Sequence, residues 1–229
     1  LKYLSLVKKY LKKSKIKKYK IVLEPSKQNT APAILAAILI KDIPNEQPLV
    51  ILPVDHLVDK LAVFNRIITK NKKYLTDKNI FIFGVKPTSP SSDYGYFLTK
   101  KISENINKVI KFIEKPNIIK AKKIIEKRGF WNSGIFFSRK DSLINNYKSL
   151  QPLIYKNCQN SVFHSKIKKN VYFLNKKYFS KAKSKSFDYA ILEKGKEING
   201  ISLNIPWSDL GSWREISKIY YKYKNKYFK

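Results

Sequence analysis

The stretch Leu49-Val50-Ile51-Leu52-Pro53-Val54-Asp55 decides the predicted fold, because it is a continuous apolar run that ends at a carboxylate. A run without polar alternation is typical of a buried strand in a parallel sheet. A second apolar strand is expected over Ile80–Val85, which Pro87 follows. Helical spacing over residues 31–41 and 57–70 places helices before and between these strands. The sequence therefore predicts an α/β fold with a mixed, mainly parallel central sheet.

The remaining elements follow from the same patterns of apolar spacing and turn residues. Short strands are expected over residues 19–23, 94–98, 109–113, 133–137 and 201–205. Helices are expected at the basic N-terminus (1–20) and over residues 117–127, 141–150, 187–193 and 212–223. The polar, Lys/Ser-rich segment 164–186 is interpreted as a mobile excursion.

Composition limits the function classes that fit this chain. Its 229 residues, 43% of them hydrophobic, suffice for one large or two small globular domains. No apolar run reaches the roughly 18–20 residues that span a bilayer, and no signal peptide is recognisable, so a membrane protein and a secreted one are not expected. The single cysteine, Cys158, excludes an internal disulfide, and the two histidines, His56 and His164, are interpreted as structural.

The net charge of +32 is unusually high and raises the question of a polyanionic partner. Of the 48 basic residues only four are arginine, whereas proteins that bind bases and phosphates favour arginine for its bidentate geometry. The abundance of Lys, Ile, Asn and Tyr is typical of an AT-rich genome. The charge is therefore interpreted mainly as solvated surface, and a nucleic acid is not the expected partner.

Two aspartates are the candidate metal ligands. Asp55 lies at the carboxyl end of a predicted strand, where ligands bind in open α/β sheets. Asp209 lies in a loop that opens the last predicted helix. Two carboxylates that meet there would suit Mg²⁺, which favours one or two carboxylates together with substrate phosphates. The alternative is that each aspartate caps a helix.

Four further segments carry candidate binding groups, each with a plain structural alternative. The polar loop 24–32 could present backbone N–H groups to a base or phosphate, or be an ordinary capped turn. Gly95 between two tyrosines could admit a ligand close to the backbone, or form a bulge. Glu114-Lys115 suits a sugar hydroxyl and a phosphate, or is an exposed ion pair. Asn132 could point into a cleft or belong to a strand-entry turn. Asp188 is expected to cap a helix.

The order of these segments along the chain is more specific than any one of them. Together they resemble the bacterial mannose-1-phosphate guanylyltransferases, or GDP-mannose pyrophosphorylases, over roughly residues 3–220. The matching segments are Glu24-Pro25, Asn29-Thr30-Ala31-Pro32-Ala33-Ile34, Leu52-Pro53-Val54-Asp55-His56, Tyr94-Gly95-Tyr96, Phe112-Ile113-Glu114-Lys115-Pro116, Trp131-Asn132-Ser133-Gly134, Phe187-Asp188-Tyr189-Ala190 and Trp207-Ser208-Asp209-Leu210-Gly211-Ser212-Trp213.

The resemblance implies a Rossmann-like, GT-A-like nucleotidyltransferase fold. It also implies a cytoplasmic enzyme that makes GDP-mannose from GTP and mannose 1-phosphate with Mg²⁺, without a membrane partner, and it leaves a homodimer open. The residues that it assigns are Asp55 and Asp209 to catalysis and the metal, Glu24, Asn29 and Thr30 to the nucleotide, and Gly95, Glu114, Lys115 and Asn132 to the sugar phosphate. Asp188 would support the sugar pocket.

The chain also departs from the family pattern. Gln28, Val54 and Asp93 stand where Arg, Ala and Gly are usual. Residues 1–229 are expected to form a single catalytic domain without a C-terminal isomerase domain. The family's Gly-rich phosphate loop is not found, so this domain is expected to be truncated at its N-terminus and nearly inactive alone. The alternatives are a non-catalytic nucleotide-sugar-binding remnant and a basic nucleic-acid-binding protein.

Overall fold

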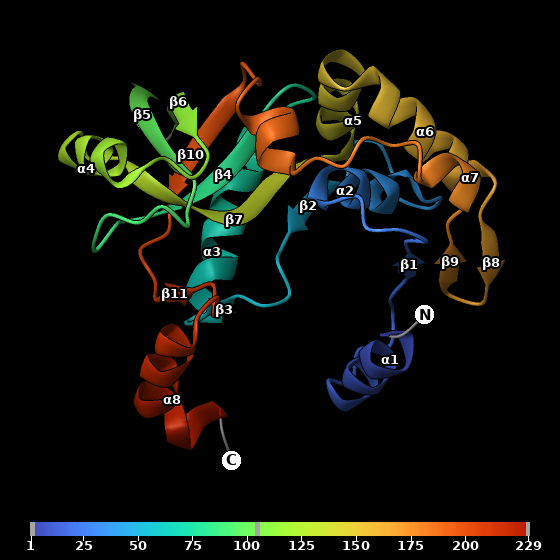
Figure 1. Cartoon of the computed structure of the whole chain (residues 1–229), viewed down its shortest axis with the longest axis horizontal. Helices are drawn as coiled ribbons and strands as arrows, with labels where there is room; N and C mark the ends of the chain where they lie inside the picture. The colour runs from blue at the N-terminus through green and yellow to red at the C-terminus, as the bar shows by residue number, and fades with distance from the viewer. Residues whose placement is uncertain (1–2, 104–105, 228–229) are drawn as a thin grey trace. The chain divides into compact units, whose positions relative to one another are not determined.

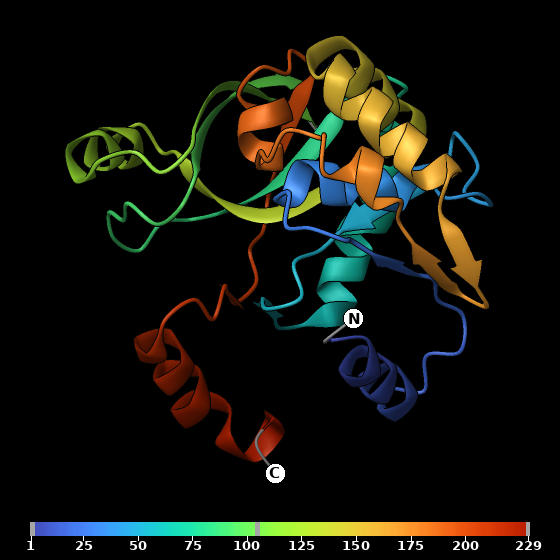
Figure 2. The same cartoon turned by 45° about the vertical axis from the view of Figure 1, so that its right-hand side comes forward.

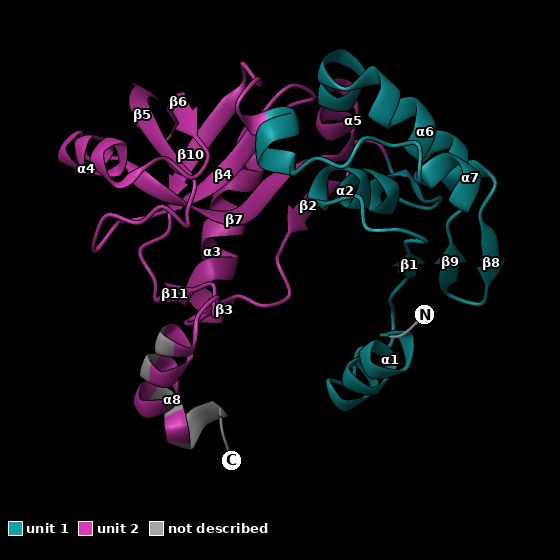
Figure 3. Cartoon of the chain, in the orientation of Figure 1, with its two compact units in different colours: residues 1–44, 146–191 teal, residues 45–145, 192–229 magenta. Residues whose placement is uncertain are grey.

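The chain folds into two compact units, which a computed structural model describes over residues 3–103 and 106–227. Unit 1 consists of residues 1–44 and 146–191, and unit 2 of residues 45–145 and 192–229 (Figure 3). Both units are built from segments distant in sequence. The prediction that residues 1–229 act as one catalytic domain stays a prediction.

Unit 2 contains a six-stranded sheet in the order β2-β7-β4-β10-β6-β5. Its strands are β2 (Pro48–Ile51), β4 (Ile80–Val85), β5 (Tyr96–Ser103), β6 (Ile106–Ile113), β7 (Phe130–Arg139) and β10 (Ile198–Ser202). The predicted mixed sheet is confirmed, but among the described strands of this sheet the parallel pairing is confined to β10 with β4. The sheet is therefore mainly antiparallel. An apolar run indicates that a strand is buried on both faces, but it does not indicate whether the neighbouring strands are parallel or antiparallel to it.

The centre of the sheet is the part that the sequence predicted most accurately. β4 has the predicted bounds, and its residues Ile80–Phe83 are almost completely buried. Phe81 and Phe83 pack with Ile135, Phe137 and other residues into one apolar cluster. The helix α3 (Leu61–Asn71) covers this face and contributes Phe64 (Figure 1).

The first expected strand differs in place and pairing. β2 pairs antiparallel with β7 and lies at the edge of the sheet, so it is neither parallel nor buried. Val50 and Leu52 remain exposed. Pro48 opens the strand, which suits an edge because proline cannot donate to a second neighbour.

Several other elements complete unit 2. A second helix, α4 (Ile118–Glu126), packs with Tyr96 and Trp131 in a smaller cluster, and Asn117 caps it by accepting from the Lys120 N–H at 2.9 Å. β3 (Leu57–Val58) and β11 (Trp207–Ser208) form a separate two-stranded ladder, so the predicted helix 57–70 begins only after β3. The unit also contains the 3₁₀ turn Lys72–Tyr74 and α8 (Trp213–Tyr227), while α5 (Lys140–Leu150) crosses its boundary.

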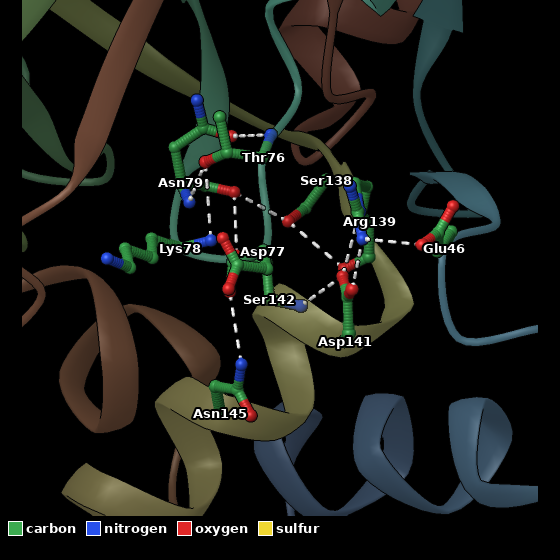
Figure 4. A network of polar contacts seen from close by, with 10 residues as sticks. All are labelled: Glu46, Thr76, Asp77, Lys78, Asn79, Ser138, Arg139, Asp141, Ser142 and Asn145. Carbon is green, nitrogen blue, oxygen red and sulfur yellow. Dashed lines mark hydrogen bonds and ion pairs between the residues drawn. The ribbon is translucent and has the colours of Figure 1, made fainter.

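A polar network fixes the start of β4 to the junction of β7 and α5 (Figure 4). The buried Asn79 donates to the Tyr74 carbonyl at 2.8 Å and accepts from the Thr76 N–H at 3.0 Å. Its own carbonyl accepts from the hydroxyls of Ser138 and Ser142, both at 2.8 Å. The network satisfies polar groups that would otherwise be costly to bury.

Unit 1 is built around two helices, α2 (Thr30–Leu39) and α6 (Pro152–Phe163), which lie side by side in both views (Figures 1 and 2). α6 was not expected from the sequence. The buried Tyr147 hydroxyl donates to the Ala31 carbonyl at 2.7 Å and anchors the start of α2. The basic amphipathic helix α1 (Leu4–Lys13) has no buried residue among those described.

The segment 164–186 is ordered in structure, so its interpretation as a mobile excursion is wrong. It forms β8 (Lys166–Lys168), β9 (Val171–Phe173) and the short helix α7 (Lys176–Phe179). β9 pairs parallel with β1 (Ile21–Leu23). The expected helix at 187–193 is a π-helix, Asp188–Leu192. No helix among the described residues is long and apolar enough to cross a bilayer.

Candidate active site

Three of the predicted sugar-binding residues form one row across three neighbouring strands. Tyr96 pairs with Ile113 on one side and with Trp131 on the other. Continuing this antiparallel register by one residue places Glu114 and Asn132 on either side of Gly95. The Asn132 N–H donates to the Gly95 carbonyl at 2.7 Å, as this register requires.

The space at Gly95 is taken by its neighbours in the row. A Cβ atom added there would lie 2.5 Å from the Glu114 Oε2 atom and 3.5 Å from the Asn132 Cβ atom. Glycine therefore lets the Glu114 carboxylate lie over the backbone of β5. Asn132 is 8% exposed, and its Oδ1 atom accepts from the Gly134 N–H at 3.2 Å. The structure thus brings Gly95, Glu114 and Asn132 together.

Lys115 follows Glu114 directly in the chain, just after the row. Its side chain is exposed, and its backbone has a left-handed φ of 47°. This φ is unusual for a residue other than glycine and marks the sharp turn after β6. The assignment of Lys115 to the sugar phosphate stays a prediction.

The two candidate metal ligands are brought into one neighbourhood by the β3–β11 ladder. Ser208 pairs with Leu57, so the next residue pair in the antiparallel register is Asp209 with His56. Asp55 is adjacent to His56, and its side chain is 76% exposed. Partial burial lowers the pKa of His56, while the charges of Asp55 and Asp209 both act to raise it. Both carboxylates therefore lie within electrostatic reach of one imidazole.

Tyr94 connects the sugar row to Asp209. Its hydroxyl donates to the Asp209 Oδ1 atom at 3.2 Å, and the Gly211 N–H donates to the same oxygen at 3.1 Å. Burial, followed by the charge of Asp209, raises the pKa of Tyr94 far above its usual value. The phenol therefore stays protonated and can act as a donor at every physiological pH.

A pocket of about 510 Å³ lies beside Tyr94 in unit 2, and the predicted site residues are not among those that line it. Three aromatic side chains line it: Tyr94, Trp131 and Trp207. The ring centroid of Tyr94 lies 4.8 Å from that of Trp131 and 5.8 Å from that of Trp207. The loop before β5 supplies its polar lining, including Lys86 and Asp93.

The nucleotide-binding candidates belong to unit 1. Asn29 caps α2 by accepting from the Thr30 N–H at 2.8 Å, and the Thr30 hydroxyl accepts from the Phe187 N–H at 2.8 Å. Partial burial raises the pKa of Glu24. The capped turn is thus present, and the contact of these residues with a nucleotide stays a prediction.

Sequence reasoning singled out the segments that meet in unit 2 but missed three of their aromatic residues. Tyr94, Trp131 and Trp207 stand beside predicted site residues, yet they were quoted only as neighbours of Gly95, Asn132 and Asp209. In the sequence these aromatic residues look like ordinary core residues, so no pattern distinguishes them.

Comparison with known proteins identifies the family of this chain. The family model described as nucleotidyl transferase matches residues 2–226. This chain belongs to the nucleotidyl transferase family. The nucleotidyltransferase family predicted from the order of the sequence motifs is thereby confirmed, together with the α/β nucleotidyltransferase fold.

Curated nucleotidyl transferases similar to this one carry a more specific name. A mannose-1-phosphate guanylyltransferase from Escherichia coli is 36% identical over 208 residues, which cover 87% of this chain and 45% of the relative. One from Salmonella muenchen is 33% identical over 204 residues, 87% of this chain and 43% of the relative. The chain thus spans less than half the length of these relatives.

Two solved structures share the fold. A Helicobacter pylori protein described as a mannose-6-phosphate isomerase has a TM-score of 0.81 and 27% identity, and covers 90% of this chain and 82% of its own. A Thermus thermophilus protein described as a mannose-1-phosphate geranyltransferase has a TM-score of 0.74 and 22% identity, with coverages of 86% and 57%. These similarities support the architecture of this nucleotidyl transferase.

Proposed function

We propose that this chain carries out the chemistry of a mannose-1-phosphate guanylyltransferase, the transfer of GMP from GTP to mannose 1-phosphate. An oxygen of the sugar phosphate attacks the α-phosphorus of GTP in line and forms a new P–O bond. The bond from that phosphorus to the oxygen shared with the β-phosphate breaks, and pyrophosphate leaves with GDP-mannose as the other product. The family and the names of the curated relatives support this assignment.

The observation that carries the proposal is the row Glu114–Gly95–Asn132 and its connection through Tyr94 to Asp209. A carboxylate and an amide group on either side of a glycine provide the donors and acceptors that sugar hydroxyls need. The Tyr94 hydrogen bond attaches that row to one of the two carboxylates assigned to the metal. Sugar and metal groups are therefore joined within unit 2.

The residues present fit a Mg²⁺ ion. Mg²⁺ favours oxygen ligands and is commonly held by one or two carboxylates plus substrate phosphates. Asp55 and Asp209 supply two such carboxylates around His56. In the part of the chain that the structure describes, no group of three or more His, Cys, Asp or Glu side chains could hold a metal, so the other ligands would be water and phosphate. Bound Mg²⁺ would offset the charge that develops on the phosphates.

The chain's own residues have distinct roles in the proposed reaction. Glu114 and Asn132 bind and orient the mannose hydroxyls, and Lys115 neutralises the sugar phosphate. In unit 1, Glu24, Asn29 and Thr30 bind the guanine. Positioning and electrostatic stabilisation account for most catalysis in phosphoryl transfer, so these groups need not react themselves.

The proposal is tested by calorimetric titration of the 229-residue chain with GDP-mannose, GDP and UDP-glucose in the presence of Mg²⁺. We expect GDP-mannose to bind more tightly than either of the others. Glu114→Ala should weaken GDP-mannose by about 10–100-fold, since a charged hydrogen bond contributes about 1.5–3 kcal/mol, and should leave GDP unchanged. The matched control is Glu126→Ala at an exposed position of α4.

The titrations also separate the proposal from its alternatives. Equal affinity for all three ligands would contradict it. Tight GDP-mannose binding would support a non-catalytic binding protein if no pyrophosphate is released from GTP and mannose 1-phosphate even when the family's Gly-rich loop segment is fused to the chain. Steeply salt-dependent binding to duplex DNA without GDP-mannose binding would support the nucleic-acid alternative. A cytoplasmic location and a homodimer remain predictions that belong to the same proposal.

A further inference from the structure

His56 lies where the metal and sugar groups of unit 2 meet. Its Nε2 atom is 4.0 Å from the Asp55 Oδ1 atom, and the charge of Asp209 acts on the same ring. The imidazole packs edge-on against Trp207, with ring centroids 5.3 Å apart and an interplanar angle of 85°. His56 thus contacts β11 directly ahead of Asp209.

The other side of the imidazole meets the turn that carries Asn132. A Cβ atom added at Gly134 would lie 3.3 Å from the His56 Cε1 atom. Gly134 has a φ of 70°, a left-handed conformation that favours glycine. The Ser133 backbone acts to raise the pKa of His56, so this turn lies close to the imidazole. The Asn132 side chain closes this turn by accepting from the Gly134 N–H.

We infer that His56 is a positioning residue, which holds the carboxylates of Asp55 and Asp209 in a fixed position relative to the sugar row. One ring lies 4.0 Å from the Asp55 carboxylate, packs on the strand that leads to Asp209 and adjoins the turn that holds Asn132. The inference deepens the proposed function, on which it rests for the identity of the metal and the sugar. No reacting atom is assigned to His56.

The physical reason is that the Asp55 side chain and the short ladder that leads to Asp209 have little support of their own. Asp55 is mostly exposed, so its rotamers are free unless a neighbour limits them. The β3–β11 ladder has only two residue pairs, so its register depends on the side chains packed beside it. Groups that orient metal ligands typically contribute 10–100-fold to metal affinity.

The experiment measures Mn²⁺ affinity by electron paramagnetic resonance, first without nucleotide, in the full chain and its variants. We expect His56→Ala to weaken Mn²⁺ by about 10–100-fold. His56→Gln, whose amide nitrogen can occupy the place of Nε2, should recover most of that loss, whereas the shorter His56→Asn should not. His164→Gln, at the other histidine of the chain and in unit 1, is the matched control and should bind Mn²⁺ as the unaltered chain does.

The second readout is the ratio of the GDP and GDP-mannose dissociation constants, with and without Mn²⁺. In the unaltered chain Mn²⁺ should raise this ratio by at least about fivefold, and in His56→Ala it should not change it. A purely structural role would lower the melting temperature of His56→Ala and leave both the Mn²⁺ affinity and this ratio unchanged, which would overturn the inference.

The remaining outcomes are also decisive. If His56→Ala does not fold, equal Mn²⁺ affinity in His56→Gln and His56→Asn overturns the inference. An unaltered chain that binds no Mn²⁺ overturns it as well. His56-dependent Mn²⁺ binding without any GDP-mannose binding would refute the proposed function and leave His56 as an organiser of the metal carboxylates alone.

Discussion

Replacing Gly95 with alanine tests the sugar row by adding one carbon atom to it. The new Cβ atom would lie 2.5 Å from the Glu114 Oε2 atom, 3.3 Å from the Phe112 Cζ atom and 3.5 Å from the Asn132 Cβ atom. Ordinary contact begins near 3.4 Å, so the carboxylate must withdraw by about 0.9 Å while the other two neighbours need hardly move. Gly95 has no left-handed φ, so its backbone accepts alanine.

The size of the effect follows from which atom has to move. The carboxylate is the free end of a flexible side chain, so we expect Gly95→Ala to change the free energy of unfolding by less than about 1 kcal/mol. A shift of about 0.9 Å is enough to break a hydrogen bond from Glu114 to a sugar hydroxyl. The loss of that charged hydrogen bond, about 1.5–3 kcal/mol, corresponds to roughly 10–100-fold weaker binding of GDP-mannose.

The assay compares calorimetric titrations of GDP-mannose and GDP with the urea unfolding midpoint of the same variant. GDP affinity and stability should be close to those of the unaltered chain, while GDP-mannose affinity falls. Gly84→Ala is the matched control, because its Cβ atom would lie 2.5 Å from the Phe97 ring and 2.7 Å from the Phe130 Cβ atom. That variant should lose about 1–3 kcal/mol of stability through overpacking. Unchanged GDP-mannose affinity in folded Gly95→Ala would refute the row as a sugar site.

Three further predictions address the other contacts. Tyr94→Phe removes the hydroxyl that donates to Asp209 and keeps the ring; we expect Mn²⁺ affinity, measured by paramagnetic resonance, to fall about tenfold, and an unchanged value would count against Tyr94 as a support of the metal site. Asn79→Ala leaves the Tyr74 carbonyl and the Thr76 N–H without their partner, so urea unfolding should show a loss of about 2–4 kcal/mol, and a loss under about 1 kcal/mol would contradict the network in Figure 4. Burial raises the pKa of Cys158 to about 12, so iodoacetamide should label this thiol at pH 8 only after unfolding, as mass spectrometry can show; rapid labelling of the native chain would refute the burial. Because the unfolded thiol ionises near pH 9, the free energy of unfolding should fall as the pH rises from 9 toward 12.

The sequence was sufficient where one local signal determined the structure. β4 was predicted with its bounds because five buried apolar residues and a following proline leave little alternative. The start of α4 was predicted because Asn117 is a strong N-cap. The order of motifs identified the family, which the match over residues 2–226 confirms.

What the sequence could not provide was pairing. The apolar run at 49–53 looks the same in a central parallel strand and in the antiparallel edge strand β2. The segment 164–186 looks like a loop because β8 and β9 are only three residues each, and their stability depends on β1, which lies about 150 residues earlier. The register between strands likewise brings Glu114, Gly95 and Asn132 together, and no single segment of the sequence indicates that register.

The row across β6, β5 and β7 restricts how this site can change in length during evolution. Glu114 and Asn132 lie 19 and 37 residues from Gly95 in the chain, and they meet it only because the three strands pair in this register. Inserting or deleting one residue between the row and the paired part of a strand would turn its side chain to the opposite face. Homologues that keep this site should therefore differ in these strands by even numbers of residues, or absorb an odd one in a β-bulge, as the strand pair β4–β7 does between Ile82 and Gly84.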